Sequence, residues 1–146
     1  MHRRSIAAIV ALLALSALLT FAPAAQATQR FTTTLTGAAE VPGPGDPDGS
    51  GTATITIHRA TGEICWSITV MGITLPASAA HIHEAPAGVA GPVDVTLSPP
   101  DATGTASGCT TVSREHAKEI AKDPAEYYVN VHNADFPAGA LRGQLG

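Results

Sequence analysis

The sequence lacks the residue patterns that mark common hydrolytic and phosphate-binding sites. It has no nucleophile elbow, no Ser-His-Asp arrangement and no glycine-rich phosphate loop, and the serines near its histidines lie in loops without a catalytic pattern. N-glycosylation sequons are also absent, because neither Asn130 nor Asn133 is followed two residues later by Ser or Thr. No complete catalytic constellation is therefore visible, and a binding or structural role is the first expectation.

Basic residues are scarce. The chain has 8 Lys and Arg residues against 12 Asp and Glu residues, with no run of Lys or Arg. Two of these cations, Arg3 and Arg4, lie in the N-terminal segment, and its removal would bring the net charge to about −6. An acidic chain without a basic cluster is a poor partner for nucleic acid or an anionic membrane. We expect no nucleic-acid partner, and a charge that serves solubility.

The N-terminal segment has the layout of a Sec-type secretory signal peptide. A basic start at residues 1–4 precedes a continuous apolar run at residues 6–22 and an A-x-A site at residues 25–27. The alternative is a transmembrane anchor, since the run is nearly long enough to cross a bilayer. Pro23 and the small-residue site favour cleavage, and no second long apolar run follows. We expect a signal peptide at residues 1–27 and one extracytoplasmic domain at residues 28–146, extracellular or periplasmic, without stable membrane insertion after cleavage.

The mature chain has two cysteines, Cys65 and Cys109. In an oxidising compartment an even pair indicates one disulfide. Closing a loop of this length would stabilise the fold by roughly 4 kcal/mol in the chain-entropy model. The alternative, a metal-thiolate site, is weaker because neither cysteine lies in a Cys-x-x-Cys or Cys/His cluster.

Short segments of alternating apolar and polar residues, separated by turn residues, recur along the mature chain. They predict strands at residues 31–36, 51–58, 63–70, 80–84, 93–97, 104–112, 126–132 and 140–145. One helix is expected at residues 113–122, with Ser113 as N-cap and Asp123-Pro124 ending it. Without a βαβ rhythm, this predicts an all-β fold: a Greek-key or immunoglobulin-like β-sandwich or barrel of about eight strands with one short crossover helix.

Two histidines share one face of the expected strand at residues 80–84. His81 and His83 are separated only by Ile82, so their Cα atoms would lie roughly 6.5–7 Å apart and both imidazoles could reach one metal ion. His132 lies on the face of its strand opposite Val129. If the two strands are neighbours, the three imidazoles suit Cu²⁺ or Zn²⁺. The alternative is that these histidines only solvate an outer face.

Four further residues have side chains that could take part in a site, and each has a structural alternative. Glu84 could orient a histidine as an outer-shell carboxylate, or it could be a solvated loop acid. His58, at a strand end, and His116, on the helix, are interpreted as surface residues, and Trp66 as part of the core.

Two long motifs resemble a known family. AHIHEAPAGVAGPV and AEYYVNVHNADFPAGALRGQL closely resemble the CHRD domain, named for its repeats in the developmental antagonist chordin and also found in secreted microbial proteins. The resemblance covers about the whole mature chain, including GSGTATITI and GEICWSITV. It implies a secreted β-domain acting as a non-catalytic extracellular binding or structural module, whose partner is an unknown extracellular protein or a metal ion.

A more distant resemblance concerns the histidines. HIHE is similar to the HVHE strand of copper/zinc superoxide dismutases, and VNVH to their later VVH strand. This implies His81, His83 and His132 as copper ligands on the outside of a Greek-key barrel. The loop after Glu84 is short and has no histidine to match that family's zinc loop, and Arg142 follows His132 too closely to match its substrate-guiding arginine. The alternative function is therefore a copper- or zinc-binding protein, without an expectation of dismutase activity.

Overall fold

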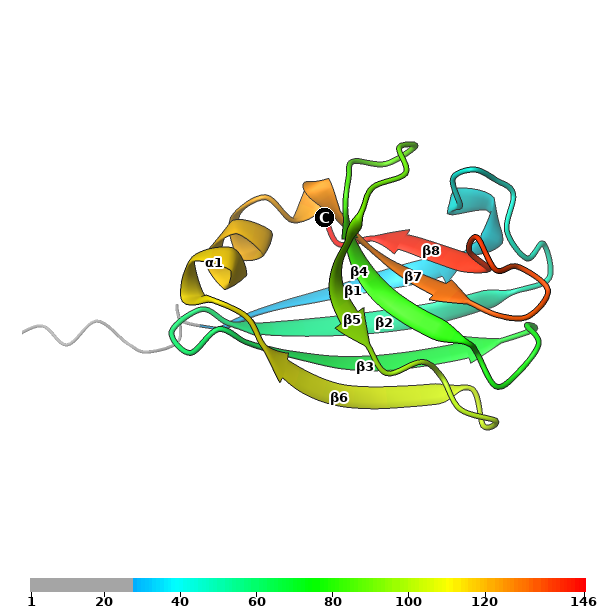
Figure 1. Cartoon of the computed structure of the whole chain (residues 1–146), viewed down its shortest axis with the longest axis horizontal. Helices are drawn as coiled ribbons and strands as arrows, with labels where there is room; N and C mark the ends of the chain where they lie inside the picture. Colours follow the sequence, from blue (N-terminus) through cyan, green and yellow to red (C-terminus); the bar gives the residue numbers. More distant parts are fainter. Residues whose placement is uncertain (1–27) are drawn as a thin grey trace, which may run out of the picture.

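The computed structural model describes residues 28–146, so the predicted signal peptide lies outside the described residues (Figure 1). Within residues 28–146, eight antiparallel strands form one sheet that bends into a nearly closed barrel, with a single short α-helix at one end (Figure 1). The all-β prediction is confirmed. The strands are β1 (Thr28–Thr36), β2 (Ser50–His58), β3 (Glu63–Met71), β4 (Ala79–Glu84), β5 (Val93–Leu97), β6 (Thr105–Thr111), β7 (Tyr127–His132) and β8 (Leu141–Gln144).

The order of strands in the sheet brings distant parts of the sequence together. It runs β5-β4-β7-β8-β1-β2-β3-β6, so β5 and β6 are the two edges. β7 pairs with β4 on one side and with β8 on the other, and His81 lies opposite Asn130 in the β4–β7 register. The two histidine-bearing strands, far apart in sequence, are therefore direct neighbours.

The inner face of the sheet forms the apolar core. Strand alternation turns Ile55 and Ile64 inward, together with Ile82 on β4 and Val129 on β7, and all four side chains are fully buried. The helix α1 (Arg114–Lys122) packs Ile120 against this core. Two short 3₁₀ turns, η2 (Gly37–Ala39) and η3 (Pro124–Glu126), complete the elements.

The ends of α1 follow the predicted capping. The hydroxyl oxygen of Ser113 accepts a hydrogen bond from the backbone N–H of His116 at 3.1 Å, which satisfies one of the free donors of the first turn. Asp123 is the C-cap, directly before Pro124. Among residues 28–146 no helix is both long enough and apolar enough to cross a membrane.

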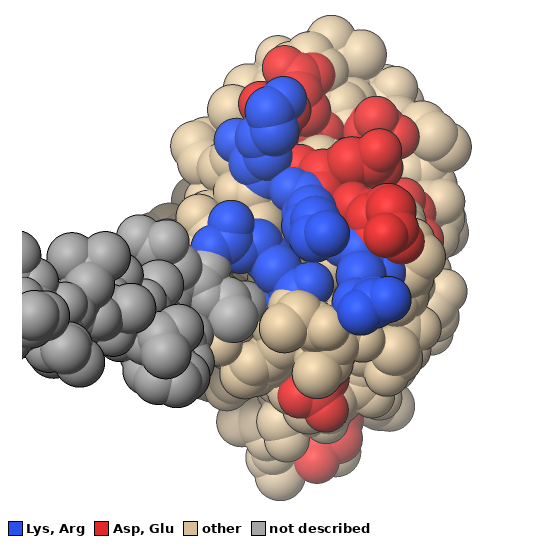
Figure 2. Space-filling model, turned by 90° about the vertical axis from the view of Figure 1, so that its left-hand side faces the viewer, with Lys and Arg blue, Asp and Glu red and all other residues tan. Residues whose placement is uncertain are grey.

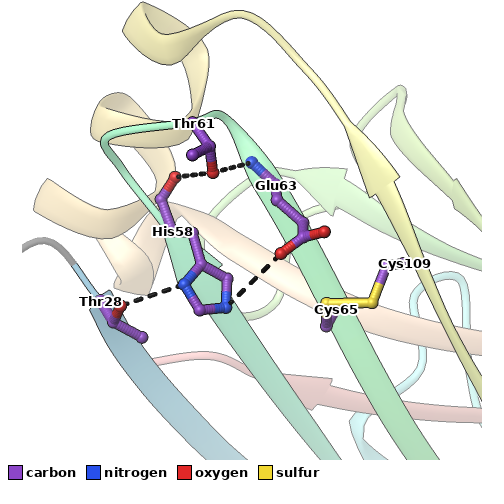
Figure 3. Close-up of polar contacts among 6 residues, drawn as sticks. All are labelled: Thr28, His58, Thr61, Glu63, Cys65 and Cys109. Carbon is purple, nitrogen blue, oxygen red and sulfur yellow. Dashed lines mark hydrogen bonds and ion pairs between the residues drawn. A yellow bond between two sulfur atoms is a disulfide. The ribbon is translucent and has the colours of Figure 1, made fainter.

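The predicted disulfide is present. Cys65 on β3 and Cys109 on β6 lie directly opposite each other in the strand register, with their sulfur atoms 2.11 Å apart (Figure 3). The bond joins an edge strand to its one neighbour in the sheet. Cross-linking two residues 44 positions apart restricts the unfolded chain and stabilises the fold by roughly 4 kcal/mol.

Basic residues that are separate in the sequence gather on one face of the molecule. Figure 2 shows the Lys and Arg side chains as a band that runs beside a group of Asp and Glu side chains. On α1, the exposed Arg114, Lys118 and Lys122 follow at intervals of four residues and so share one side of the helix. The acidic neighbours give this face charges of both signs rather than a single-sign field.

The outer face of β7 is covered rather than solvated. Tyr128 and Asn130, which alternate with the core residues, are each only 3% exposed. Two loops lie over them: residues 85–92 between β4 and β5, and the segment around η2 between β1 and β2. The domain therefore has a second, polar layer outside the barrel, and the histidines belong to it.

Candidate metal site

Three histidines meet on the outer side of the barrel. His81 and His83 come from β4, and His132 ends β7 diagonally across from His81. One ring nitrogen of each lies within 4.8 Å of the other two, and Nδ1 of His81 is 3.2 Å from Nε2 of His132. The structure thus brings all three histidines named from the sequence to one place.

Local backbone geometry helps to aim the rings. The pairing of β4 with β5 shifts register between Ile82 and His83, an irregularity that bends a strand and redirects its side chains. The ring of His83 stands nearly perpendicular to that of His81, with an interplanar angle of 85° and centroids 5.4 Å apart. The two imidazoles of this strand therefore converge rather than stack.

Backbone carbonyl groups fix which nitrogen of two rings can bind a metal. Nδ1 of His83 lies 3.0 Å from the carbonyl oxygen of Gly91, and Nδ1 of His132 lies 3.0 Å from that of Pro137. A carbonyl oxygen can only accept, so each Nδ1 carries the proton and each Nε2 carries the lone pair. Nδ1 of His81 lies 3.2 Å from Nε2 of His132, and in the tautomer of His81 that carries its proton on Nε2 this Nδ1 has a lone pair. In that tautomer the donor set is Nδ1 of His81 with Nε2 of His83 and His132.

One of these donor atoms has no hydrogen-bond partner among residues 28–146. His83 is 8% exposed, and the atom without a partner in this part of the chain is its buried Nε2. Leaving a buried polar atom unpaired costs free energy, roughly 1–3 kcal/mol. His81 and His132 are partly exposed, so one side of the cluster opens to solvent. A metal ion fits this arrangement because it would satisfy the buried nitrogen and still have room for a solvent ligand.

The surroundings keep two of the imidazoles neutral. Burial lowers the pKa of His81, and the neighbouring His132 and His83 lower it further. Burial also lowers the pKa of His132, against the opposing effect of the hydrogen bond to Pro137 and with a further lowering from His83. Neutral imidazole is the form that coordinates a metal, so both rings are ready ligands at neutral pH.

The sequence left two roles open for Glu84, an orienting carboxylate or a solvated loop acid. The side chain of Glu84 is exposed and makes no hydrogen bond to a histidine within residues 28–146. His116, interpreted as a surface residue, places Nε2 2.8 Å from the carboxylate of Asp94 on β5. Trp66 lies in the core as expected.

A second group of possible ligands lies on strands β2 and β3, which are separated from β4 and β7 by β8 and β1 in the sheet. His58, Glu63 and Cys65 place one potential ligand atom each within 4.8 Å of one another (Figure 3). The sulfur of Cys65 is bonded to Cys109 and is not available as a thiolate. His58 is held by the hydroxyl of Thr28 at 3.0 Å and by Glu63 at 3.7 Å. This group is therefore a set of satisfied surface contacts.

Sequence reasoning missed the buried polar residues beside the histidines. Burial raises the pKa of Glu40 to about 7, against the opposing charge of Arg142, and its carboxylate accepts a hydrogen bond from Nδ2 of Asn130 at 2.6 Å. Arg142 is 1% exposed and places its guanidinium 3.4 Å from the ring centre of Tyr128. Arg142 and Gln144 alternate with Leu141 on β8, and that alternation was the available signal that they occupy the outer face.

Comparison with known proteins places the chain in a family. The model of the CHRD domain family matches residues 31–145, and the chain belongs to that family. No curated protein and no solved structure matches the chain significantly. The likeness to copper/zinc superoxide dismutases therefore depends on the two short histidine motifs alone.

Proposed function

We propose that this CHRD domain is an exported, non-catalytic extracellular module that binds one copper or zinc ion through His81, His83 and His132. The observation that carries the proposal is the buried Nε2 of His83, which has no hydrogen-bond partner among residues 28–146, on a ring that lies within ligand distance of two further imidazoles. A metal ion is the simplest partner that would satisfy all three nitrogens at once.

The donor types favour copper or zinc over other divalent ions. All three donors are imidazole nitrogens, and no carboxylate or thiolate belongs to the group. Magnesium and calcium prefer oxygen ligands, whereas imidazole suits copper and zinc. Among divalent first-row metals Cu²⁺ gives the highest affinity for a nitrogen site, so we expect copper to bind more tightly than zinc.

The extracellular part of the proposal is supported by the family and by the disulfide. CHRD domains are extracellular-type modules, and disulfides persist in oxidising compartments. The predicted signal peptide provides the export route. The non-catalytic part is supported by the loop at residues 85–92, which has no histidine that could bridge to a second metal.

The direct experiment is metal loading of the purified mature domain. We would incubate apo-protein with Cu²⁺ or Zn²⁺, remove unbound metal by desalting, and measure bound metal by inductively coupled plasma mass spectrometry. We expect about one equivalent in the wild type and in His116→Ala, whose ring lies outside the cluster. No retained copper would overturn the proposal, and superoxide turnover above the background of free copper would contradict its non-catalytic part.

A further inference from the structure

Tyr128 lies against the face of His83, the most buried of the three ligand candidates. Its ring stacks on the imidazole of His83 with centroids 4.8 Å apart and planes only 6° from parallel. Tyr128 and His83 are directly opposite in the β4–β7 register, so their side chains leave the sheet on the same side. The stack fixes the plane of the His83 ring and thereby the direction in which Nε2 points.

The hydroxyl of Tyr128 also reaches the residue that sets the His83 tautomer. The backbone N–H of Gly91 donates to the Tyr128 hydroxyl oxygen at 3.1 Å, and the carbonyl oxygen of Gly91 accepts from Nδ1 of His83 at 3.0 Å. A Cβ atom at Gly91 would lie 2.0 Å from the carbonyl oxygen of Glu84, so the close approach of this loop requires glycine. Tyr128 thus holds both the ring and its hydrogen-bond acceptor.

Arg142 supports Tyr128 from the other side. β7 lies between β4 and β8, and Arg142 on β8 pairs with Asn130, diagonally across from Tyr128. The guanidinium packs on the Tyr128 ring and donates to the carbonyl oxygens of Val89 and Pro86, at 2.8 and 2.9 Å, in the same loop as Gly91. Among the described residues it has no carboxylate in ion-pair contact. The carbonyl groups and the aromatic ring therefore provide the main direct contacts of a fully buried cation.

We propose that Tyr128 is the positioning residue of the histidine site: it selects Nε2 of His83 as the metal-binding atom and holds the ring in its plane, with Arg142 fixing Tyr128 and the loop above it. The expected effect of Tyr128 on metal affinity rests on the proposed metal-binding function. Its effect on the tautomer of His83 does not need a metal and can be tested in the metal-free protein.

The first measurement needs no metal. Long-range ¹H–¹⁵N spectra of the apo-protein report which nitrogen of His83 is protonated. We expect the Nδ1–H form in the wild type and in Tyr127→Phe, a matched change of the neighbouring tyrosine, whose side chain lies on the core face. Tyr128→Leu removes both the stack and the hydroxyl, and we expect a mixture of tautomers. A retained single Nδ1–H form in folded Tyr128→Leu would overturn the inference.

The second measurement is the affinity for Cu²⁺ in competition with a chelator, on variants with a wild-type circular dichroism spectrum. Loss of an outer-shell partner typically costs about 10–100-fold in metal affinity, and we expect a loss in that range for Tyr128→Leu. Tyr128→Phe keeps the stack and loses only the bond to Gly91, so its loss should be smaller. Tyr127→Phe should match the wild type.

The outcomes separate this inference from the proposed function. If the wild type binds no copper, the proposed function fails while the tautomer measurement still decides the role of Tyr128. If the wild type binds copper and folded Tyr128→Leu binds equally well, the positioning role fails while the metal site stands. If Tyr128→Leu does not fold, Tyr128→Phe decides: faster amide exchange at Gly91 with weaker copper binding supports the inference, and no change in either overturns it.

Discussion

The domain has two groups of potential metal ligands with similar spacing and different surroundings. His81, His83 and His132 place one ligand atom each within 4.8 Å of one another, and so do His58, Glu63 and Cys65. In the first group, backbone carbonyl groups orient two rings, and one buried nitrogen has no partner among residues 28–146. In the second group, the sulfur is bonded to another cysteine (Figure 3). The side chains of His58 and Glu63 are 37% and 47% exposed.

Proximity of ligand-type residues does not by itself make a metal site. The histidine cluster differs in its supporting contacts. The carbonyl oxygens of Gly91 and Pro137 accept hydrogen bonds from Nδ1 of His83 and His132 and so fix which nitrogen is protonated, and the covering loop at residues 85–92 excludes water from His83. The second group lacks such support, and its members already satisfy one another.

Removing the disulfide should destabilise the fold without touching the histidine cluster. The double variant Cys65→Ser/Cys109→Ser is expected to lose roughly 4 kcal/mol of unfolding free energy, because the unfolded chain gains the freedom of the opened loop. Urea denaturation measures this loss. Copper affinity of the folded fraction should stay within a factor of two, and a large loss of affinity would mean that the two regions are coupled.

Removing one ligand should abolish tight binding in the first group alone. His132→Ala leaves two imidazoles on one strand, and we expect at least a roughly 100-fold loss of Cu²⁺ affinity, about 3 kcal/mol. His58→Ala is the matched control from the second group, and its affinity should equal that of the wild type. Chelator competition with both variants side by side makes the comparison. Equal losses would place the metal elsewhere.

Glu40→Gln should stabilise the domain at alkaline pH. Burial raises the pKa of Glu40 to about 7 from an ordinary value of 4.5, so the carboxyl stabilises the fold fully below pH 4.5, and this contribution is lost as pH rises through 7. Glutamine can keep the hydrogen bond with Asn130 without the charge. We expect a gain of about 1–2 kcal/mol at pH 8, after screening, that vanishes by pH 4.

Measuring unfolding free energy across pH 4–8 checks the sign. A variant that is less stable than the wild type at pH 8 would mean that the longer-range attraction between Glu40 and Arg142 outweighs the cost of burying the charge.

The smallest effect is the pH response of the metal-free histidine cluster. The pKa values of His81 and His132 are lowered in the folded protein, so the unfolded chain takes up protons first as pH falls below 6.5. Their contribution to stability is present above pH 6.5 and is lost as pH falls through the lowered pKa values. His81→Gln/His132→Gln should flatten this part of the stability profile between pH 7.5 and 5.5. An identical slope in the variant would show that the cluster does not titrate in this range.

The sequence allowed the inner half of this molecule to be predicted better than the outer half. Period-two alternation located all eight strands within three residues at either end, because burial of one sheet face leaves a direct trace in the sequence. The same rule placed His81 and His83 together on the sheet face opposite that of Ile82. Whether β7 lies beside β4 depends on chain topology, which alternation does not encode.

The support of the site could not be predicted, because it comes from backbone atoms and from loop closure. Gly91 and Pro137 act through carbonyl oxygens that every residue has, so no residue type announces them. Glu84 could be named as a possible orienting group, beside the alternative of a solvated acid, because its side chain is visible in the sequence. Arg142 alternates with Leu141 and so lies on the outer face of β8, and only the covering loop at residues 85–92 buries that face.

Pulsed electron paramagnetic resonance of the domain loaded with one equivalent of Cu²⁺ tests whether His81, His83 and His132 bind one ion together, because it counts the imidazole rings bound to copper. We expect three coordinated imidazoles in the wild type and in His58→Ala, and two in His132→Ala. A wild-type spectrum with two or fewer imidazoles, or a spectrum that changes in His58→Ala and not in His132→Ala, would contradict this prediction.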